Sequence, residues 1–371
     1  MPRKDRLKPV TTVAFPDPGW CQQFRRRLLT WFRSHARDLP WRRTRDPYAI
    51  WVSEIMLQQT QVATVIDYFQ RFLAAFPTLA DLAAADQQQV LRQWEGLGYY
   101  RRARQMHQAA QLIVQQHDGR FPQDLQAIVA LPGIGRYTAG AIMSIAWDAR
   151  TPILEANTIR LYSRLLAYRE DPTRGEGQRI LWALAEHLLP RNHCGQFNQA
   201  LMELGSEICT PRDPNCQQCP VRQLCPTQAA GLQDQIPIPS KKTVYEPLLE
   251  AALVVHRDGL VLLRHCGPDE RWAGMWDFPR FAVRKPQGKA FAAEAVQRVA
   301  ELTGQQVEVG EHLTTIKHGV TRYRITLVCH RARWIDGAAD RDDLRWVTAH
   351  QLEQVPLNVS SRKISRLMIE Q

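Results

Sequence analysis

Four cysteines crowd into one short segment of the chain. Cys209, Cys216, Cys219 and Cys225 follow the spacing C-x6-C-x2-C-x5-C, whereas the other four cysteines are scattered. A secreted disulfide framework would spread its pairs across a small domain. Clustered thiols instead predict a closed metal site, and four thiolates can hold either tetrahedral zinc or a four-iron cluster. The spacing alone leaves both metals open.

A second chemical feature is the glycine-rich segment LPGIGRYTAG at residues 131–140. Gly133 and Gly135 allow the backbone to approach a ligand closely, and the helix that follows offers unpaired N–H groups at its start. Phosphate oxygens suit this arrangement, which holds DNA without reading its bases. The alternative interpretation is a plain connection between two helices, with Pro and Gly as stop and start signals.

The elements that must position these features differ between the two halves of the chain. From residue 18 to about 205, apolar residues recur at helical spacing and Gly or Pro marks most gaps, so this part is predicted to be all-α. The pattern predicts one long helix over 51–72. Further helices are expected at 86–94, 103–116, 125–130, 136–147, 158–168 and 178–188.

After the cysteines the pattern changes. Residues 226–247 mix Pro, Gln and Lys without periodicity, which is typical of a linker. Beyond it, β-rich runs at 249–255, 259–264, 323–334 and 343–347 surround a helix expected at 291–302. The predicted organisation is a helical domain at 18–225 that ends in the cysteine loop 209–225, the linker 226–247, and an α+β domain at 248–371.

Composition limits the partners. Among 371 residues there are 48 Lys and Arg against 37 Asp and Glu, a formal net charge of +11, which favours a polyanionic partner. The most apolar stretch, 137–147, is too short to span a bilayer, and no signal-peptide pattern follows the basic first residues. We therefore expect a cytoplasmic protein with no membrane partner.

Several sequence blocks in a fixed order carry a family resemblance. LPGIGRYTAG, PILEAN (152–157) and FNQALMELGSEICT (197–210) resemble the helix-hairpin-helix DNA glycosylase superfamily. LPWRRTRDPYAIWVSEIMLQQTQVATVIDYF (39–69) and GLGYYRRARQMHQAA (96–110) are similar to adenine DNA glycosylases of the MutY type. The resemblance implies a [4Fe-4S] cluster on Cys209, Cys216, Cys219 and Cys225, and an all-α helix-hairpin-helix domain followed by an α+β Nudix-like domain.

The resemblance also implies two catalytic carboxyls. Glu54 matches the general acid that protonates adenine, and Glu155 stands where the family pattern P-[IV]-x-D-G-N has the Asp that faces the sugar. Glu keeps the negative charge that an oxocarbenium-like sugar needs, but it is one methylene longer. Ala156 also replaces the family glycine. Retained chemistry, altered base specificity and a slow enzyme all remain open.

Two further pocket residues follow from the same resemblance. Tyr137 and Asn157 are assigned to the catalytic pocket, where each can hydrogen-bond the carboxyls or the sugar. Bifunctional relatives such as endonuclease III carry Lys at the Tyr137 position, and tyrosine cannot form the Schiff base of a lyase. The enzyme is therefore expected to be monofunctional. Without the family match, Tyr137 would be interpreted as a core tyrosine and Asn157 as a helix cap.

The remaining implied residues contact DNA. Gln58 and Tyr99 occupy positions that wedge into the base stack, and Arg42 and Gln199 lie near the purine pocket. A phosphate-binding face or a merely solvated helix face is expected from Arg101, Arg102, Arg104 and His107.

The C-terminal segments ALVVHRDGLVLLRH and RWAGMWDFPRF resemble the Nudix-like domain with which these glycosylases recognise 8-oxoguanine. Only Glu301 of the glutamates that hold Mg²⁺ in true Nudix hydrolases is present, so pyrophosphatase activity is not expected. Val320, Thr321 and Arg322 replace the Phe-Ser-His that reads the lesion in the family. Either they read it in changed form, or they belong to a strand that only packs against the core.

The resulting expectation is a monomeric, monofunctional DNA glycosylase of base excision repair. It would hydrolyse the N-glycosidic bond of adenine mispaired with 8-oxoguanine or guanine in double-stranded DNA. The alternatives are a glycosylase with altered base specificity and a catalytically slow lesion-binding protein.

Overall fold

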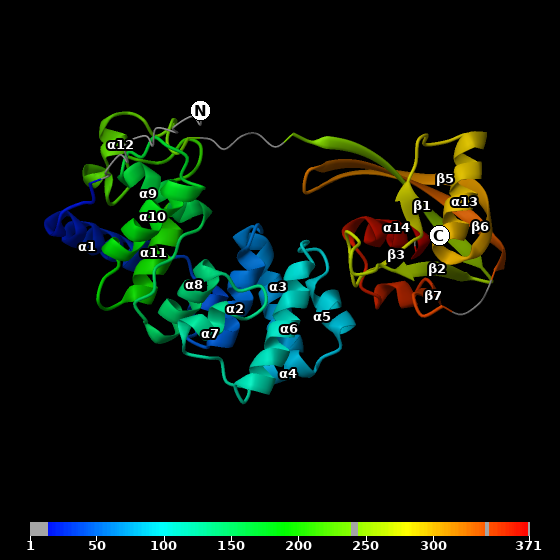
Figure 1. Ribbon diagram of the computed structural model, residues 1–371, viewed down its shortest axis with the longest axis horizontal. Coiled ribbons are helices and arrows are strands. Elements are labelled where there is room, and N and C mark those ends of the chain that lie inside the picture. The colour runs from blue at the N-terminus through cyan, green and yellow to red at the C-terminus, as the bar shows by residue number, and fades with distance from the viewer. Residues whose placement is uncertain (1–13, 239–243, 338–340, 370–371) are drawn as a thin grey trace, which may run out of the picture. The chain divides into compact units, whose positions relative to one another are not determined.

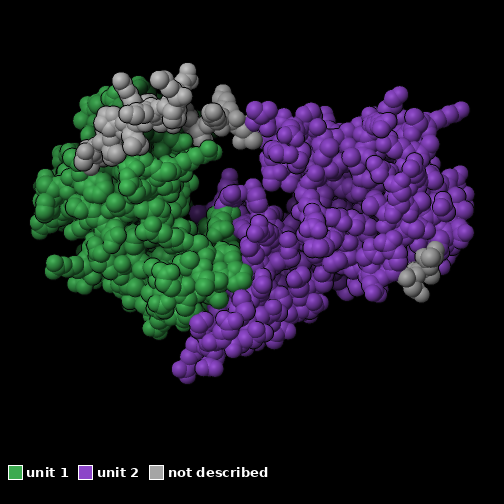
Figure 2. Space-filling model, viewed as in Figure 1, with its two compact units in different colours: residues 1–58, 121–242 green, residues 59–120, 243–371 purple. Residues whose placement is uncertain are grey.

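The computed structural model describes residues 14–238, 244–337 and 341–369, and the chain forms two compact units that are not continuous in sequence (Figure 2). One unit joins residues 1–58 to 121–242, and the other joins 59–120 to 243–371. Residues 239–243 of the predicted linker lie outside the described residues.

The first unit is helical, and its described residues contain no strand, as expected (Figure 1). Its core lies among the apolar faces of the first helix and three later helices, where Phe24, Leu28, Leu184 and Phe197 are fully buried. The helices of this unit are α1 (Pro18–His35), η1 (Pro40–Arg42), α2 (Pro47–Leu57), α7 (Leu125–Val129), α8 (Arg136–Trp147), α9 (Ala156–Leu165), α10 (Gly175–Leu188), α11 (Cys194–Glu207), η2 (Arg222–Leu224) and α12 (Pro226–Ala229).

The prediction of one long helix over 51–72 is wrong. Helix α2 ends at Leu57 and α3 begins at Val62. Gln59 between them has a φ of 57°, in the left-handed region, which interrupts the helix without a glycine or proline. The four residues at 58–61, QQTQ, are all polar, so the apolar period is interrupted at the break, a signal that the prediction overlooked.

The second unit combines four helices from the first half of the chain with a sheet from the second half. The helices are α3 (Val62–Ala75), α4 (Leu79–Ala84), α5 (Gln87–Trp94) and α6 (Arg101–Gln116). The later elements are β1 (Glu246–Arg257), β2 (Leu260–His265), β3 (Trp276–Asp277), β4 (Arg280–Ala282), α13 (Lys289–Thr303), β5 (Gln305–Val320), β6 (Tyr323–Gly337), β7 (Leu344–Val347), η3 (Gln351–Glu353) and α14 (Val359–Ile369).

The seven strands form one mixed sheet with the order β3-β2-β1-β6-β5, to which β4 adds against β1 and β7 against β2. Strand β1 pairs in parallel with β6, and the other pairs are antiparallel. Apolar side chains cover both faces of β1, because α14 packs on one side with Ile364 and α13 packs on the other with Phe291. A strand buried on both faces reads as a continuous apolar run, as 251–255 does.

Polar contacts join the four helices of this unit to the sheet. The Gln88 Nε2 donates to the Gly274 carbonyl at 3.0 Å, and the Trp276 Nε1 donates to the Gln88 Oε1 at 3.1 Å. Arg104 donates to the carbonyl of Ala273. Among the described residues, no helix has the length and apolar character needed to cross a membrane.

Candidate active site

Glu54 lies in the most buried helix of the first unit. Helix α2 begins after Asp46, whose carboxylate accepts from the N–H groups of Tyr48 and Ala49 and caps the helix. Every residue from 48 to 56 is buried, and Glu54 is 5% exposed. A charge at such a position loses its hydration, so the carboxyl needs either a partner or a proton.

The partner of Glu54 is the hydroxyl of Tyr137. In the first turn of α8, the Tyr137 Oη donates to the Glu54 Oε2 at 2.7 Å and lies 3.3 Å from the Met202 sulfur. A neutral hydroxyl gives only partial compensation for burial. The pKa of Glu54 is raised to about 7, chiefly by desolvation and further by the charge of Glu155, against the opposing hydrogen bond from Tyr137.

Glu155 lies at the N-cap of α9 and is half-buried. Its carboxylate accepts from the backbone N–H groups of Asn157 and Thr158, each at 2.9 Å, and the Thr158 hydroxyl accepts in turn from the Glu155 N–H. Burial raises the pKa of Glu155 above its usual range, and the N–H groups of Asn157 and Thr158 together with Arg160 oppose part of this increase. The N-terminus of a helix is also a favourable place for an anion.

The two carboxyls therefore differ in what stabilises their charge. For Glu54, a pKa change from 4.5 to about 7 corresponds to roughly 3 kcal/mol against the ionised form. Glu155 instead has two N–H donors and a helix terminus for its negative charge. Coupled carboxyls in unequal surroundings divide into an acid and an anion, and this geometry assigns the proton to Glu54.

The replacement of the family glycine by Ala156 requires no backbone shift. Ala156 is the first residue of α9 and is not among the residues with positive φ. The longer Glu155 side chain still reaches the N–H groups that a capping Asp would accept from. The two departures from the family pattern are thus compatible with a capped helix.

Asn157 connects this pocket to the cysteine loop through Arg160. The Arg160 Nη2 donates to the Asn157 Oδ1 at 2.9 Å and to the Gly205 carbonyl at 2.6 Å, and its Nε donates to the Cys209 carbonyl at 2.6 Å. A Cβ at Gly205 would lie 2.8 Å from the Asn157 Cβ, so glycine permits this approach. Arg160 thus connects the start of α9, the end of α11 and the cysteine loop.

Arg164, one turn further along α9, holds the same loop. Its guanidinium donates to the Cys209 Sγ at 3.2 Å and to the carbonyls of Thr210, Gln233 and Ile236, each at 2.8 Å. Positive charge beside a sulfur suits a thiolate ligand.

The four cysteines fit a bound cluster. Cys209, Cys216, Cys219 and Cys225 line one cavity together with Arg164. Burial raises the pKa of Cys219 to about 12, so this thiol needs the charge of a metal to become a ligand. Four thiols that line one cavity suit a closed metal site with thiolate ligands.

Arg42 is held by a buried acid that the sequence analysis missed. Glu203, 1% exposed, accepts from the Arg42 Nη2 at 2.8 Å and from Arg37 at 2.7 Å. Burial would raise the pKa of Glu203, but hydrogen bonds from Arg37 and Arg42 outweigh it and lower the pKa to about 2. This ion pair fixes η1 against α11.

The glycine-rich turn before α8 contains two glycines of different kinds. Gly133 has a φ of 78°, which requires glycine. Gly135 is the exposed N-cap of α8 with ordinary extended backbone, and a Cβ there would meet no atom within 4 Å. Among the residues that the structure describes, none explains the absence of a side chain at Gly135.

The other predicted DNA contacts divide between the two units. Gln58 ends α2, and its Nε2 donates to the Thr138 hydroxyl at 3.4 Å. Gln199 is half-buried in α11 of the same unit. Tyr99 belongs to the second unit, where it is 52% exposed at a φ of 48° in the turn before α6.

The phosphate face expected on α6 is only partly present. Arg101 is exposed, but His107 is 5% exposed. Arg102 donates to the carbonyls of Leu97 and Gly98. Arg104 is bonded to Ala273, so tertiary contacts use most of this face.

Val320, Thr321 and Arg322 form the tip of the β5–β6 hairpin. Val320 pairs with Tyr323, which leaves a two-residue turn in which Thr321 has a φ of 51°. Thr321 and Arg322 are exposed, and Arg322 forms an ion pair with Glu246 at 3.3 Å. The two residues of the turn are therefore on the surface, whereas Val320 packs against an apolar cluster of the sheet.

This tip borders a cavity of about 670 Å³ within the second unit. Tyr99 and Arg101 line it from the helical side, and Trp272, His318 and Thr321 line it from the sheet. Four basic side chains and one acid face the cavity: Arg101, Arg104, Arg271, Lys363 and Asp269.

The sequence contained partial signals for the missed residues. Arg160 and Arg164 lie four residues apart on a helix whose other residues are all uncharged, a pattern that indicates buried charge with partners. Glu203 likewise lies among apolar residues of α11, which also indicates a buried charge with a partner. No local pattern names their partners.

Comparisons with known proteins agree with this architecture. Residues 52–187 match the HhH-GPD superfamily base excision DNA repair proteins, residues 209–225 match the iron-sulfur binding domain of endonuclease III, and residues 250–367 match the NUDIX domain. A solved thermostable thymine-DNA glycosylase superposes with a TM-score of 0.53 at 31% identity, over 57% of this chain and 98% of that one. The predicted fold class and iron–sulfur loop are confirmed, and the fold is that of the HhH-GPD superfamily base excision DNA repair proteins.

More specifically, the chain belongs to the adenine DNA glycosylase family. It is 34% identical to the adenine DNA glycosylase of Buchnera aphidicola subsp. Schizaphis graminum over 70% of this chain and 76% of that one. Identity is 41% with the Rattus norvegicus enzyme and 39% with the Homo sapiens enzyme, over 81% and 79% of this chain. The chain spans only 60% and 55% of the length of those two relatives.

The role of Arg160 gives a first prediction. Arg160→Met removes one buried and two partly buried hydrogen bonds, and an acceptor left buried without a partner costs about 1–3 kcal/mol. We expect a lower melting temperature by calorimetry and weaker retention of visible iron–sulfur absorption during dialysis. Arg169→Met, which alters an exposed arginine of the same unit, should change neither. Equal behaviour of the two variants would contradict this assignment.

Proposed function

We propose that the chain is a monofunctional DNA glycosylase that hydrolyses the N-glycosidic bond of adenine mispaired with 8-oxoguanine or guanine in duplex DNA. The observation that carries this proposal is the unequal pair of carboxyls, with the proton on Glu54 and the charge on Glu155. The kinship with adenine DNA glycosylases supports adenine as the base.

Glu54 supplies the acid. An adenine leaves the sugar as an anion unless a ring nitrogen is protonated, and a carboxyl with a pKa of about 7 is half-protonated at neutral pH. Tyr137 orients the carboxyl through its hydroxyl. Transfer of the proton to the purine accompanies cleavage of the C1′–N9 bond, whose electron pair stays with the base.

Glu155 supplies the negative charge. Bond cleavage leaves a positive charge shared by C1′ and the ring oxygen of the sugar, and a preorganised carboxylate stabilises that cation. Water then adds to C1′ and releases a proton, which yields free adenine and an abasic site. Asn157, fixed by Arg160, lies beside Glu155 and can donate its amide to the sugar or to the carboxylate.

Tyr137 also makes the proposed enzyme monofunctional. Strand cleavage by a lyase requires an amine that forms a Schiff base with the sugar, and a phenol cannot form one. The cluster, held by the four cysteines, would supply a rigid loop next to α9 and takes no part in these steps.

The decisive experiment measures base release. Purified protein is incubated with duplexes that carry adenine, thymine or other bases opposite 8-oxoguanine or guanine, and abasic sites are revealed with alkali. Glu54→Gln should lower single-turnover adenine release by about 10²–10⁴-fold through loss of the acid, and Glu155→Gln by about 10²–10³-fold through loss of the charge. Glu170→Gln, at an exposed acid of the same unit, is the control.

The other outcomes separate the alternatives. Release of a different base would show altered specificity. Tight binding of mismatched duplex without release of any base would show a lesion-binding protein. Full activity of Glu155→Gln would show that Glu155 does not stabilise the positive charge on the sugar.

The raised pKa of Glu54 predicts an acid requirement. Adenine release at subsaturating protein should fall as the pH rises through about 7, because Glu54 then loses the proton that it must donate. Tyr137→Phe removes a hydrogen bond that stabilises the ionised carboxylate, so the pKa of Glu54 should increase and the alkaline limb should move to higher pH. A shift of the limb to lower pH would contradict this electrostatic model of the site.

Gly135 tests the proposed contact with the DNA backbone. The open space around this N-cap would admit a phosphate to the N–H groups of α8, and a methyl group would obstruct it. Gly135→Ala should leave the melting temperature nearly unchanged but weaken duplex binding by about tenfold, since a hydrogen bond to a charged group contributes about 1.5 kcal/mol or more. Gly133→Ala should destabilise the fold because of its φ of 78°. Fluorescence anisotropy and calorimetry distinguish the two effects.

A further inference from the structure

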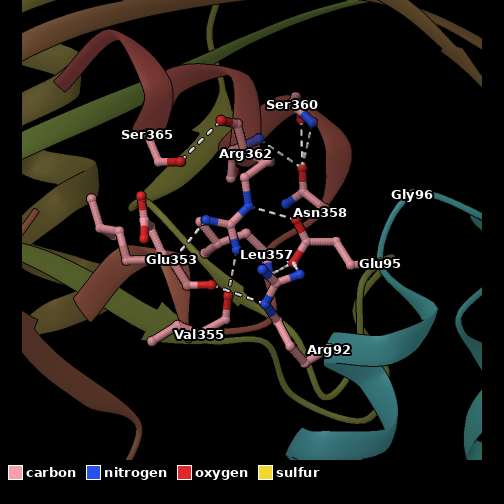
Figure 3. A network of polar contacts seen from close by, with 12 residues as sticks. Arg92, Glu95, Gly96, Glu353, Val355, Leu357, Asn358, Ser360, Arg362 and Ser365 are labelled. Atoms are coloured by element: carbon pink, nitrogen blue, oxygen red, sulfur yellow. Dashed lines mark hydrogen bonds and ion pairs between the residues drawn. The ribbon is translucent and has the colours of Figure 1, made fainter. Parts of the chain in front are cut away.

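A buried ion pair joins the turn that carries Tyr99 to the C-terminal helix of the chain. Glu95 is the C-cap of α5 and the first residue of the turn 95–100, and Arg362 lies in α14 (Figure 3). The Arg362 Nε donates to the Glu95 Oε1 at 2.5 Å, and its Nη2 donates to the Glu95 Oε2 at 3.0 Å. The two side chains are only 13% and 7% exposed, and both lie in the same compact unit.

Neither partner has freedom to move. Two further N–H groups of Arg362 donate to the carbonyls of Leu352 and Val355 at 2.6 and 2.7 Å. The Glu95 Oε2 also accepts from the Leu357 N–H at 3.2 Å, and Arg92 lies 3.5 Å from it (Figure 3). A bidentate arginine–carboxylate pair with its other groups bonded has one preferred geometry.

The turn that follows Glu95 is equally constrained. The Tyr68 hydroxyl donates to the Glu95 carbonyl at 2.7 Å, and the Trp94 Nε1 donates to the Gly98 carbonyl at 3.2 Å. Gly96, Gly98 and Tyr99 all have positive φ. The direction of the exposed Tyr99 ring therefore depends on where Glu95 is held.

The two elements that the ion pair connects, the turn 95–100 and α14, both line the same cavity. Tyr99 lines the 670 Å³ cavity from the turn, while Ser360 and Lys363 line it from α14, on either side of Arg362 in the sequence. The sheet supplies the opposite lining with Trp272 and Thr321. The ion pair thus fixes the spacing between these cavity walls, although it is not among the residues that line the cavity.

We infer that Glu95 and Arg362 are positioning residues that set discrimination for the base opposite the adenine. This inference rests on the proposed function and on the family resemblance, which implies that Tyr99 enters the base stack and that the Nudix-like domain recognises 8-oxoguanine opposite the adenine. Both groups must engage one DNA duplex together, and displacement by about 1 Å from a change outside the chemistry can lower a rate on the order of a hundredfold. A fixed ion pair keeps Tyr99 and the sheet at a constant spacing without contacting the DNA.

The experiment compares adenine release from duplexes with adenine opposite 8-oxoguanine and opposite guanine, with full-length protein. Arg362→Met and Glu95→Gln should lower the ratio of the release rate opposite 8-oxoguanine to the release rate opposite guanine by on the order of tenfold or more. Arg362→Lys keeps the positive charge but cannot donate two parallel N–H groups to one carboxylate. Its rate ratio should therefore lie between those of Arg362→Met and the wild type. The controls are Arg366→Met, an exposed arginine on α14, and Glu353→Gln, an exposed acid at the same interface.

Hydrogen exchange gives a second readout that does not need activity. Peptides that cover residues 95–101 should exchange faster in Arg362→Met than in wild type or in Arg366→Met. A merely structural ion pair would lower both release rates by the same factor and leave their ratio unchanged, which overturns the inference. Unchanged exchange in the turn, or a wild-type protein that releases adenine equally from both duplexes, also overturns it. Failure of the wild type to release adenine from either duplex would instead refute the proposed function.

Discussion

The unequal stabilisation of two carboxyls is the constraint on which the helical unit depends. Glu54 is buried in α2 with one hydroxyl partner, whereas Glu155 receives two N–H groups and the end of a helix. The charge on Glu155 makes ionisation of Glu54 still less favourable. A proton donor and an anion are therefore produced from the same type of side chain by their surroundings alone.

Helix α9 connects this pair to the rest of the unit. Its first turn holds Glu155, and its next turns carry Arg160 and Arg164, whose guanidiniums hold the backbone and sulfur of Cys209. The cysteine loop therefore buttresses the same helix whose start is in the candidate site. A change in the loop would be transmitted to the N-terminus of α9 through buried hydrogen bonds, which have no water to replace them.

The second unit shows a comparable use of buried charge. Glu95 and Arg362 are separated by most of the chain, yet they connect the turn of Tyr99 to α14, next to the cavity bordered by the β5–β6 hairpin. Buried ion pairs contribute little net stability compared with apolar packing, but they specify one geometry. Position, more than stability, is what such a pair supplies between elements that must act on one ligand.

The sequence by itself determined the helical and the α+β halves through local periodicity, and a metal site through the spacing of the cysteines. The choice of an iron–sulfur cluster and of Glu54 and Glu155 as candidate carboxyls came from sequence blocks that resemble a known family. The helix prediction failed at Gln59, where the polar residues 58–61 interrupt the apolar period and the backbone conformation ends the helix. The sequence also did not reveal that 59–120 joins the C-terminal residues in one unit, or that Glu203, Arg160 and Glu95 have partners far along the chain. Only the tertiary structure decided those pairings. The sequence can indicate that a buried charge needs a partner, but it does not indicate which distant residue provides one.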